Sequence, residues 1–254
     1  MKTVKEWSDA FDVLFNEVMS NASASLDEYD KSIFLTKGQE EVIKNYFNPK
    51  GNKYQEGFDD NAKRQSDFAT LLKVATLTAP SSSYSKFDAR SNAYQFPVDF
   101  FIAINEQYQV SADNKTYPYT IIPLSYTEYN RMMQKPYKYP PKSQVWRLIT
   151  GEVTANNNKV PVVEIIGRYN PDGTGSYKLR YVRRPKPIIL VDLNTIDNNL
   201  SINGETSATT CELPEHIHEE ILQRAVELAK AAYATDQNGT IQLNNQVQTG
   251  QRSE

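Results

Sequence analysis

The sequence predicts an α+β protein in which helices from both ends of the chain form a small bundle. A β-rich middle region, sandwich- or barrel-like, is inserted between them, and an extended tail ends the chain. Two observations support this fold class. Apolar residues recur at helical spacing near both ends, whereas the middle of the chain alternates apolar and polar residues between regularly placed turns. We find no internal repeat and no Gly/Ser linker, so we expect the terminal helices to pack on each other.

The N-terminal helical part is predicted to span residues 1–78. Thr3-Val-Lys-Glu6 is a capping box that opens a first amphipathic helix. The run Thr36-Lys-Gly-Gln39 is a second capping box, which predicts that a second helix begins there after a short turn. A third, weaker helix is predicted from Asn61 to Val74.

A β-rich domain is predicted over residues 79–191. Its strand candidates are Phe100–Val110, Tyr117–Leu124, Val145–Thr154, Val160–Arg168 and Tyr177–Arg183. Two hairpins are expected, one through the asparagines 156–158 and one through the Asn, Asp and Gly residues of 170–175, because these residue types tolerate positive φ. A short helix from Ser125 to Gln134 interrupts the strands, with a serine cap and a glutamate three residues later.

The C-terminal part is predicted to contain three segments. Residues 192–212 form a polar loop or arm, and residues 213–236 form a helix with a wide apolar stripe that packs on the N-terminal helices. Residues 237–254 form a polar tail that is flexible in isolation. Its sparse apolar residues suit addition as a strand to a partner subunit, with Ile241, Leu243 and Val247 as the candidate contacts.

Charge and cysteine content exclude several classes of protein. A net charge of -3 and a pI near 5.6 argue against a protein that coats duplex DNA. The run Arg180–Lys186 mixes basic and aromatic residues, and we interpret it as a strand with one solvated face. The single cysteine, Cys211, cannot form an internal disulfide or a cysteine-rich zinc site. No uncharged apolar stretch reaches the roughly 18 residues of a membrane span, so we expect no membrane contact.

No catalytic or cofactor site is predicted. His216 and His218 would point about 200° apart on a helix, so we place them in a solvated first turn rather than at a joint metal site. The glycines form no phosphate-binding loop. The acidic pairs 40–41 and 59–60 are interpreted as surface residues rather than as the acid and base of a sugar cleft. Trp146 lies in an alternating strand and is interpreted as core. The 16 tyrosines suit protein contact surfaces.

Four segments carry a resemblance to a known group. They are Glu6–Asn16, Leu26–Phe47, Arg183–Leu193 and Cys211–Lys230. The first two resemble structural proteins of crAss-like phages that infect Bacteroides-type gut bacteria. The last two are similar to the end of the head–tail connector ring proteins of that group.

The resemblance implies a non-enzymatic virion protein, made in the host cytoplasm, that needs no cofactor. Such an adaptor forms a closed ring of about twelve identical subunits. The portal protein lies above the ring, the next tail ring protein lies below it, and DNA passes through the channel without sequence-specific binding. The helices would form the framework, and the β-region or arms would contact neighbours. A carbohydrate- or receptor-binding virion module remains the alternative, and a cell-wall hydrolase is a third possibility.

Overall fold

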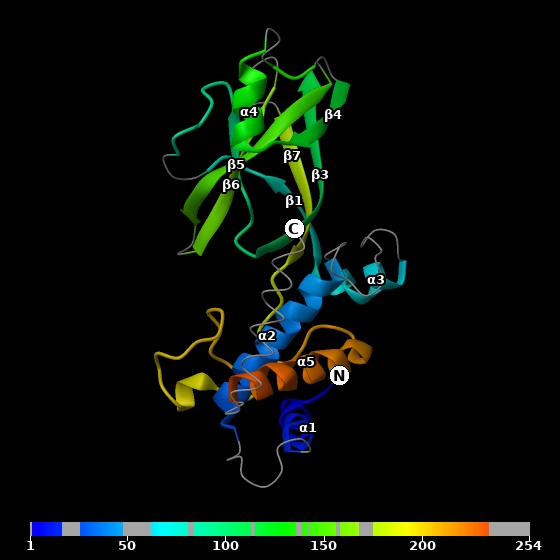
Figure 1. The fold of residues 1–254 in the computed structure, drawn as a ribbon, viewed down its shortest axis with the longest axis vertical. Coiled ribbons are helices and arrows are strands. Elements are labelled where there is room, and N and C mark those ends of the chain that lie inside the picture. Colours follow the sequence, from blue (N-terminus) through cyan, green and yellow to red (C-terminus); the bar gives the residue numbers. More distant parts are fainter. Residues whose placement is uncertain are drawn as a thin grey trace. The chain divides into compact units, whose positions relative to one another are not determined.

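The chain divides into two units in a computed structural model of the sequence (Figure 1). The helical unit comprises Met1–Thr70 and Pro185–Glu254, and the sheet unit comprises Leu71–Arg184. The structure describes residues 2–16, 26–47, 62–80, 84–112, 115–135, 139–141, 143–155, 158–167 and 175–233. The predicted α+β class, with helices from both ends of the chain around a β-rich middle, is confirmed.

The helical unit is built from four α-helices among the described residues. They are α1 (Val4–Asn16), α2 (Glu28–Phe47), α3 (Ala62–Asp67) and α5 (Glu215–Tyr233). The capping box that opens α1 is formed as predicted. The Glu6 carboxylate accepts a hydrogen bond from the backbone N–H of Thr3 at 2.6 Å, and the Thr3 hydroxyl accepts one from the backbone N–H of Glu6 at 3.3 Å. Helix α5 packs on both α2 and α1 (Figure 1), so the terminal helices share one core.

Helix α2 is longer than predicted, and Thr36 does not cap it. The helix runs without a break from Glu28 to Phe47. Thr36 is buried in its middle, where its hydroxyl accepts a bond from the backbone N–H of Ile188 at 3.1 Å, and Ser32 accepts one from Leu190 at 3.0 Å. The hydroxyls of this helix therefore satisfy the backbone of a distant segment instead of a helix end.

The predicted third helix ends earlier than expected. Helix α3 stops at Asp67, a 3-10 turn follows at Ala69–Leu71, and residues Leu72–Leu77 form strand β1. Phe68 and Leu71 are buried, as predicted for the helix face, but the chain beyond them pairs with a strand. This pairing overrides the weak local helical pattern. The sheet unit consequently begins at Leu71, earlier than the boundary after residue 78 that the sequence suggested.

The segment after Pro185 lies against α2 within the helical unit. Ile189 bridges Thr209, Leu193–Thr195 form a 3-10 turn, and Ile202 pairs with Glu205 across a two-residue turn. In that turn Asn203 and Gly204 both have positive φ, which is typical of an Asn-Gly type I′ hairpin. The predicted loop 192–212 is therefore packed, with an apolar cluster beneath it made of Ile189, Leu193 and Ile202 with Tyr29 and Ile33 of α2.

The sheet unit is one curled sheet of seven strands within the described residues, in the order β1-β7-β3-β4-β5-β6-β2. After β1, the strands are β2 (Asn92–Gln95), β3 (Phe100–Ala112), β4 (Lys115–Pro123), β5 (Gln144–Ala155), β6 (Asn158–Ile166) and β7 (Gly175–Arg183). Helix α4 (Tyr126–Met133) connects β4 to its parallel neighbour β5, and Ser125 opens it with the predicted capping box.

The curl brings the two ends of the sheet together. Strand β4 pairs with β3 through its first half and with β5 through its second half, so the sheet turns at this strand. The two outermost strands then meet in a bridge between Thr78 and Gln95. The curled sheet encloses a tyrosine-rich core, formed by Leu77, Tyr94, Phe96, Tyr108, Val145, Val163, Ile165, Tyr177, Leu179 and Tyr181.

One predicted hairpin is confirmed and the other is wrong. Strands β5 and β6 pair antiparallel across residues 156–157, as expected. Strand β7 pairs with β1 and β3, not with β6, whose two neighbours are β5 and β2. The alternation of β7 fits this position, because its aromatic and apolar residues enter the core while Lys178 stays exposed.

Candidate assembly surfaces

The two histidines lie in different environments. His216 is half exposed, and its Nε2 atom lies 3.0 Å from the carboxylate of Asp67. His218 is completely buried, which corrects its predicted place in a solvated turn. Its Nε2 atom lies 2.9 Å from the carbonyl oxygen of Leu213, and its ring packs 5.0 Å from the ring of Trp7. Burial lowers the pKa of His218, so the neutral ring is favoured in the folded protein.

One buried acid has a structural explanation. Glu164 on β6 is fully buried and accepts hydrogen bonds from the backbone N–H groups of Phe87 and Asp88, at 2.7 and 3.2 Å. The hydroxyls of Ser91 and Tyr84 donate to the same carboxylate, at 2.5 and 3.2 Å. These donors hold segment 84–91 on the sheet, so Glu164 is an anchor for this segment. Sequence reasoning missed this role, because no local signal links Glu164 to a loop so far away in the chain.

The acids considered for a sugar cleft do not form one in the part of the chain that the structure describes. Glu41 accepts a 2.5 Å hydrogen bond from Arg224, and Glu40 accepts one from Asn203 at 3.2 Å. The pair 59–60 lies outside the described residues. Trp146 is only 6% exposed, so it is a core residue and offers no platform for sugar stacking. No cluster of three or more metal-ligating side chains occurs among the residues described.

Cys211 is a core residue. It is fully buried, and burial raises the pKa of its thiol to about 11. A thiol with so high a pKa is protonated at neutral pH and is a poor nucleophile. It therefore suits no catalytic role.

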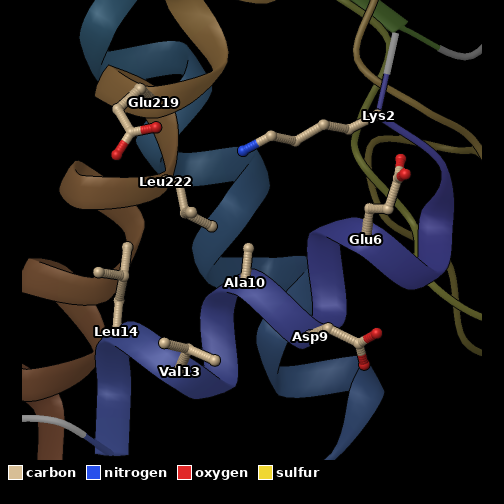
Figure 2. A pocket seen from close by; sticks show the side chains of 8 residues that line it. All are labelled: Lys2, Glu6, Asp9, Ala10, Val13, Leu14, Glu219 and Leu222. Carbon is tan, nitrogen blue, oxygen red and sulfur yellow. The ribbon is translucent and has the colours of Figure 1, made fainter.

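An apolar groove with an acidic rim lies between α1 and α5 (Figure 2). It is lined by Lys2, Glu6, Asp9, Ala10, Val13 and Leu14 on the α1 side and by Glu219 and Leu222 on α5. Val13 is 58% exposed, an unusual position for a large apolar side chain on a helix that buries Trp7 and Phe11 on its other face. Bonds from Thr3 lower the pKa of Glu6, so this part of the rim keeps its negative charge in mild acid.

A second exposed apolar position lies on the outer face of the sheet unit. Val74 on β1 is 69% exposed and stands directly opposite Arg180 on β7. The next pair on the same face is Thr76 with Lys178, and β3 places Gln107 beside Lys178. Val74 is therefore flanked by basic and neutral polar side chains. We call this surface, made of Val74, Thr76, Lys178 and Arg180, the basic strand pair.

A third exposed surface is aromatic. Phe87 and Tyr126 contact each other edge to face with ring centroids 4.9 Å apart, and the Tyr126 hydroxyl donates a 3.2 Å hydrogen bond to the carbonyl of Ile149. All three residues are substantially exposed. Because the rings pack on each other and one hydroxyl is hydrogen-bonded, the patch holds its exposed side chains in fixed positions at the surface.

Comparison with known proteins identifies the family. Residues 1–241 match the family described as phage tail ring protein 3/4. The chain belongs to this family. It is 48% identical over 252 residues to "Ring protein 4/5" of Bacteroides phage crAss001, which covers 99% of each chain. It is 30% identical over 232 residues to "Ring protein 3" of the same phage, which covers 89% of this chain and 94% of the relative.

The family match includes both units, the acid-rimmed groove and the basic strand pair. The predicted partner-strand residues Ile241, Leu243 and Val247 lie outside the described residues, and the last two also lie beyond the family match. None of the helices described here is long and apolar enough to cross a bilayer.

Sequence reasoning missed both exposed valines. Val13 falls beside the apolar stripe of α1 and carries no motif of its own. Val74 was assigned to the end of a helix, which concealed its place on the outer face of a strand. An exposed valine is recognisable only once the faces of its element are known.

Proposed function

We propose that this protein is a structural subunit of a phage virion that assembles into a closed ring in the connector between head and tail. The observation that carries the proposal is the 48% identity, across the whole length of both chains, to a protein named as a ring protein. The match to the tail ring protein family supports the same role. In this reading the protein is made in the host cytoplasm, needs no cofactor and catalyses no reaction.

The finer arrangement is also part of the proposal. The ring consists of about twelve copies related by one rotation axis. It docks beneath the portal protein, meets the next tail ring protein on its other side, and lets DNA pass without sequence-specific binding. The helical unit forms the framework, and the aromatic patch of Phe87, Tyr126 and Ile149 offers a surface for a neighbouring ring.

The tail is proposed to order on a partner. Residues 237–254 would add as a strand to an adjacent subunit, with Ile241, Leu243 and Val247 as apolar contacts. Removing residues 237–254 should weaken assembly. Assembly of the truncated chain with unchanged affinity would contradict the strand-adding role and leave the ring itself in place.

The decisive experiment is to purify the full chain with and without the portal protein of its phage, and to measure mass and particle shape by native mass spectrometry and electron microscopy. We expect a ring, alone or on the portal. A chain that stays monomeric and never joins the portal would overturn the proposal. Saturable binding of the monomer to a glycan would instead support a carbohydrate-binding module.

A further inference from the structure

The two units of the chain carry opposite charge. The sheet unit, residues 71–184, contains 15 Lys and Arg against 8 Asp and Glu, a net charge of +7. The helical unit contains the remaining 13 Lys and Arg against 23 Asp and Glu, a net charge of -10. These two values give the net charge of -3 for the chain. The small net charge of the chain is therefore the sum of two large and opposite net charges, one on each unit.

The two most exposed large apolar side chains of the described residues are divided between the units in the same way. Val74, 69% exposed, lies among basic side chains on the sheet unit. Val13, 58% exposed, lies in the groove of the helical unit, whose charged lining is three acids, Glu6, Asp9 and Glu219, and one cation, Lys2, so that the groove is acidic in net charge. Each unit thus combines an exposed valine with neighbouring charges that match the net charge of that unit, basic on the sheet unit and acidic on the helical unit.

We propose that the acid-rimmed groove of one copy binds the basic strand pair of the next copy, so that Val74 enters the groove beside Val13. This inference rests on the proposed ring. Neighbours related by rotation in a ring make a heterologous contact, which needs two different and complementary patches on every subunit. The groove and the strand pair are two such patches. Burial of the valines contributes affinity, and the opposite charges select orientation and speed the encounter.

The same charges disfavour the symmetric alternatives. Two grooves that faced each other would bring Glu6, Asp9 and Glu219 of one copy against the same acids of its partner. Two strand pairs would place Lys178 and Arg180 against each other. Like charges in contact cost several kcal/mol. The chain therefore favours a head-to-tail contact, which can propagate around a ring, over a closed dimer.

Cysteine cross-linking tests the orientation of the contact in the full chain. In the double variant Val13→Cys/Val74→Cys, mild oxidation should give a ladder of covalent oligomers that reducing agent removes. Val13→Cys or Val74→Cys alone should give no cross-link, and an equal mixture of the two single variants should give dimers only. Cys211 is buried and leaves the background low. Dimers of either single variant, or a double variant that forms only an internal disulfide, would overturn the proposal.

Charge reversal tests the complementarity. Asp9→Lys/Glu219→Lys reverses the rim of the groove, and Lys178→Glu/Arg180→Glu reverses the strand pair. Each variant alone should self-associate at least about tenfold more weakly at low salt, because like charges then face each other. An equal mixture of the two variants should recover assembly, since alternating copies restore every contact. Added salt should weaken wild-type assembly as it screens these charges.

Control variants place charge reversals of the same sign elsewhere on each unit. Glu205→Lys lies on the exposed turn of the helical unit, and Lys159→Glu lies at the exposed start of β6. Both controls should assemble as the wild type does. Equal losses in controls and groove variants, or a mixture that does not recover, would contradict the proposed contact.

The charge variants also distinguish a failure of the proposed contact from a failure of the proposed ring, and from a role of the basic strand pair in nucleic-acid binding. Normal rings formed by every charge variant would refute the contact and leave the proposed function standing, whereas a wild-type chain that forms no ring under any condition would refute both. If Lys178→Glu/Arg180→Glu assembled normally but lost binding to duplex DNA, the basic strand pair would be a nucleic-acid surface and the contact would be wrong.

Discussion

Replacing Gly38 with alanine should force α2 away from α5. A Cβ atom at this position would lie 2.9 Å from the backbone nitrogen of Ala225 and 3.0 Å from the carbonyl oxygen of Ile221. Both are backbone atoms of α5, so no side-chain rotation relieves the contact. Overpacking of a core lowers the free energy of unfolding by about 1–3 kcal/mol. We expect the upper value, about 3 kcal/mol, because backbone atoms cannot rotate away from the added methyl group. Alanine favours a helix over glycine by about 1 kcal/mol, which leaves a net loss of about 2 kcal/mol.

Urea unfolding followed by the fluorescence of Trp7 measures this loss. Trp7 is buried in the helical unit and Trp146 in the sheet unit, so a Trp146→Phe background makes the signal specific to the helices. With a slope of about 2 kcal/mol per M, the midpoint should fall by about 1 M. The control Lys37→Ala, at an exposed position beside Gly38, should change stability by less than about 0.5 kcal/mol. A gain of about 1 kcal/mol for Gly38→Ala, the value of helix propensity alone, would refute the close packing of α2 on α5.

Three further predictions concern buried groups. Glu164→Gln should destabilise the sheet unit by about 3 kcal/mol, measured by Trp146 fluorescence after urea unfolding, because the anchor of segment 84–91 loses its charge-assisted bonds. Because burial lowers the pKa of folded His218, the unfolded chain binds more protons in mild acid, so stability should be full above pH about 6.5 and fall below it. His218→Gln should flatten that fall and His216→Gln should retain it; equal slopes in both variants would contradict this assignment. Cys211 should react with a thiol reagent only after urea unfolds the protein, and fast labelling of the native chain would contradict its burial.

Local sequence signals predicted the elements that local forces determine. The capping boxes at Thr3 and Ser125 form because the cap and the glutamate three residues later satisfy each other within one turn. The equally regular pattern at Thr36 failed. Its hydroxyl bonds the backbone of Ile188 on a distant segment. A local sequence pattern does not reveal whether a threonine hydroxyl will cap its own helix or form a hydrogen bond with a distant segment.

Strand patterns predicted which way side chains face, but not which strands become neighbours. The alternation of Tyr177, Lys178 and Leu179 correctly assigns two core residues and one exposed residue to β7. The same alternation is compatible with β7 as a neighbour of β6 or as a central strand between β1 and β3. Which position β7 takes depends on how the whole sheet closes around its core. For the candidate surfaces the limit is the same. Val13 and Val74 are candidate contact residues only because they are exposed, and their exposure depends on how segments distant in the sequence pack.

If the proposed ring assembles beside related ring proteins, its subunits must join copies of themselves in preference to those relatives. Two relatives of this chain, at 48% and 30% identity, are ring proteins of the same phage, crAss001, so related ring proteins occur together in one phage. The opposite net charges of the two units orient one subunit relative to the next, but a relative with the same distribution of charge would be attracted in the same orientation. Discrimination must then come from the shape of the apolar contact, where an added or missing methyl group changes the free energy by about 1 kcal/mol. Val13→Ala or Val74→Ala should therefore weaken self-association while leaving its dependence on salt unchanged. A change in that salt dependence would show that the valines and the charges do not act as separate contributions.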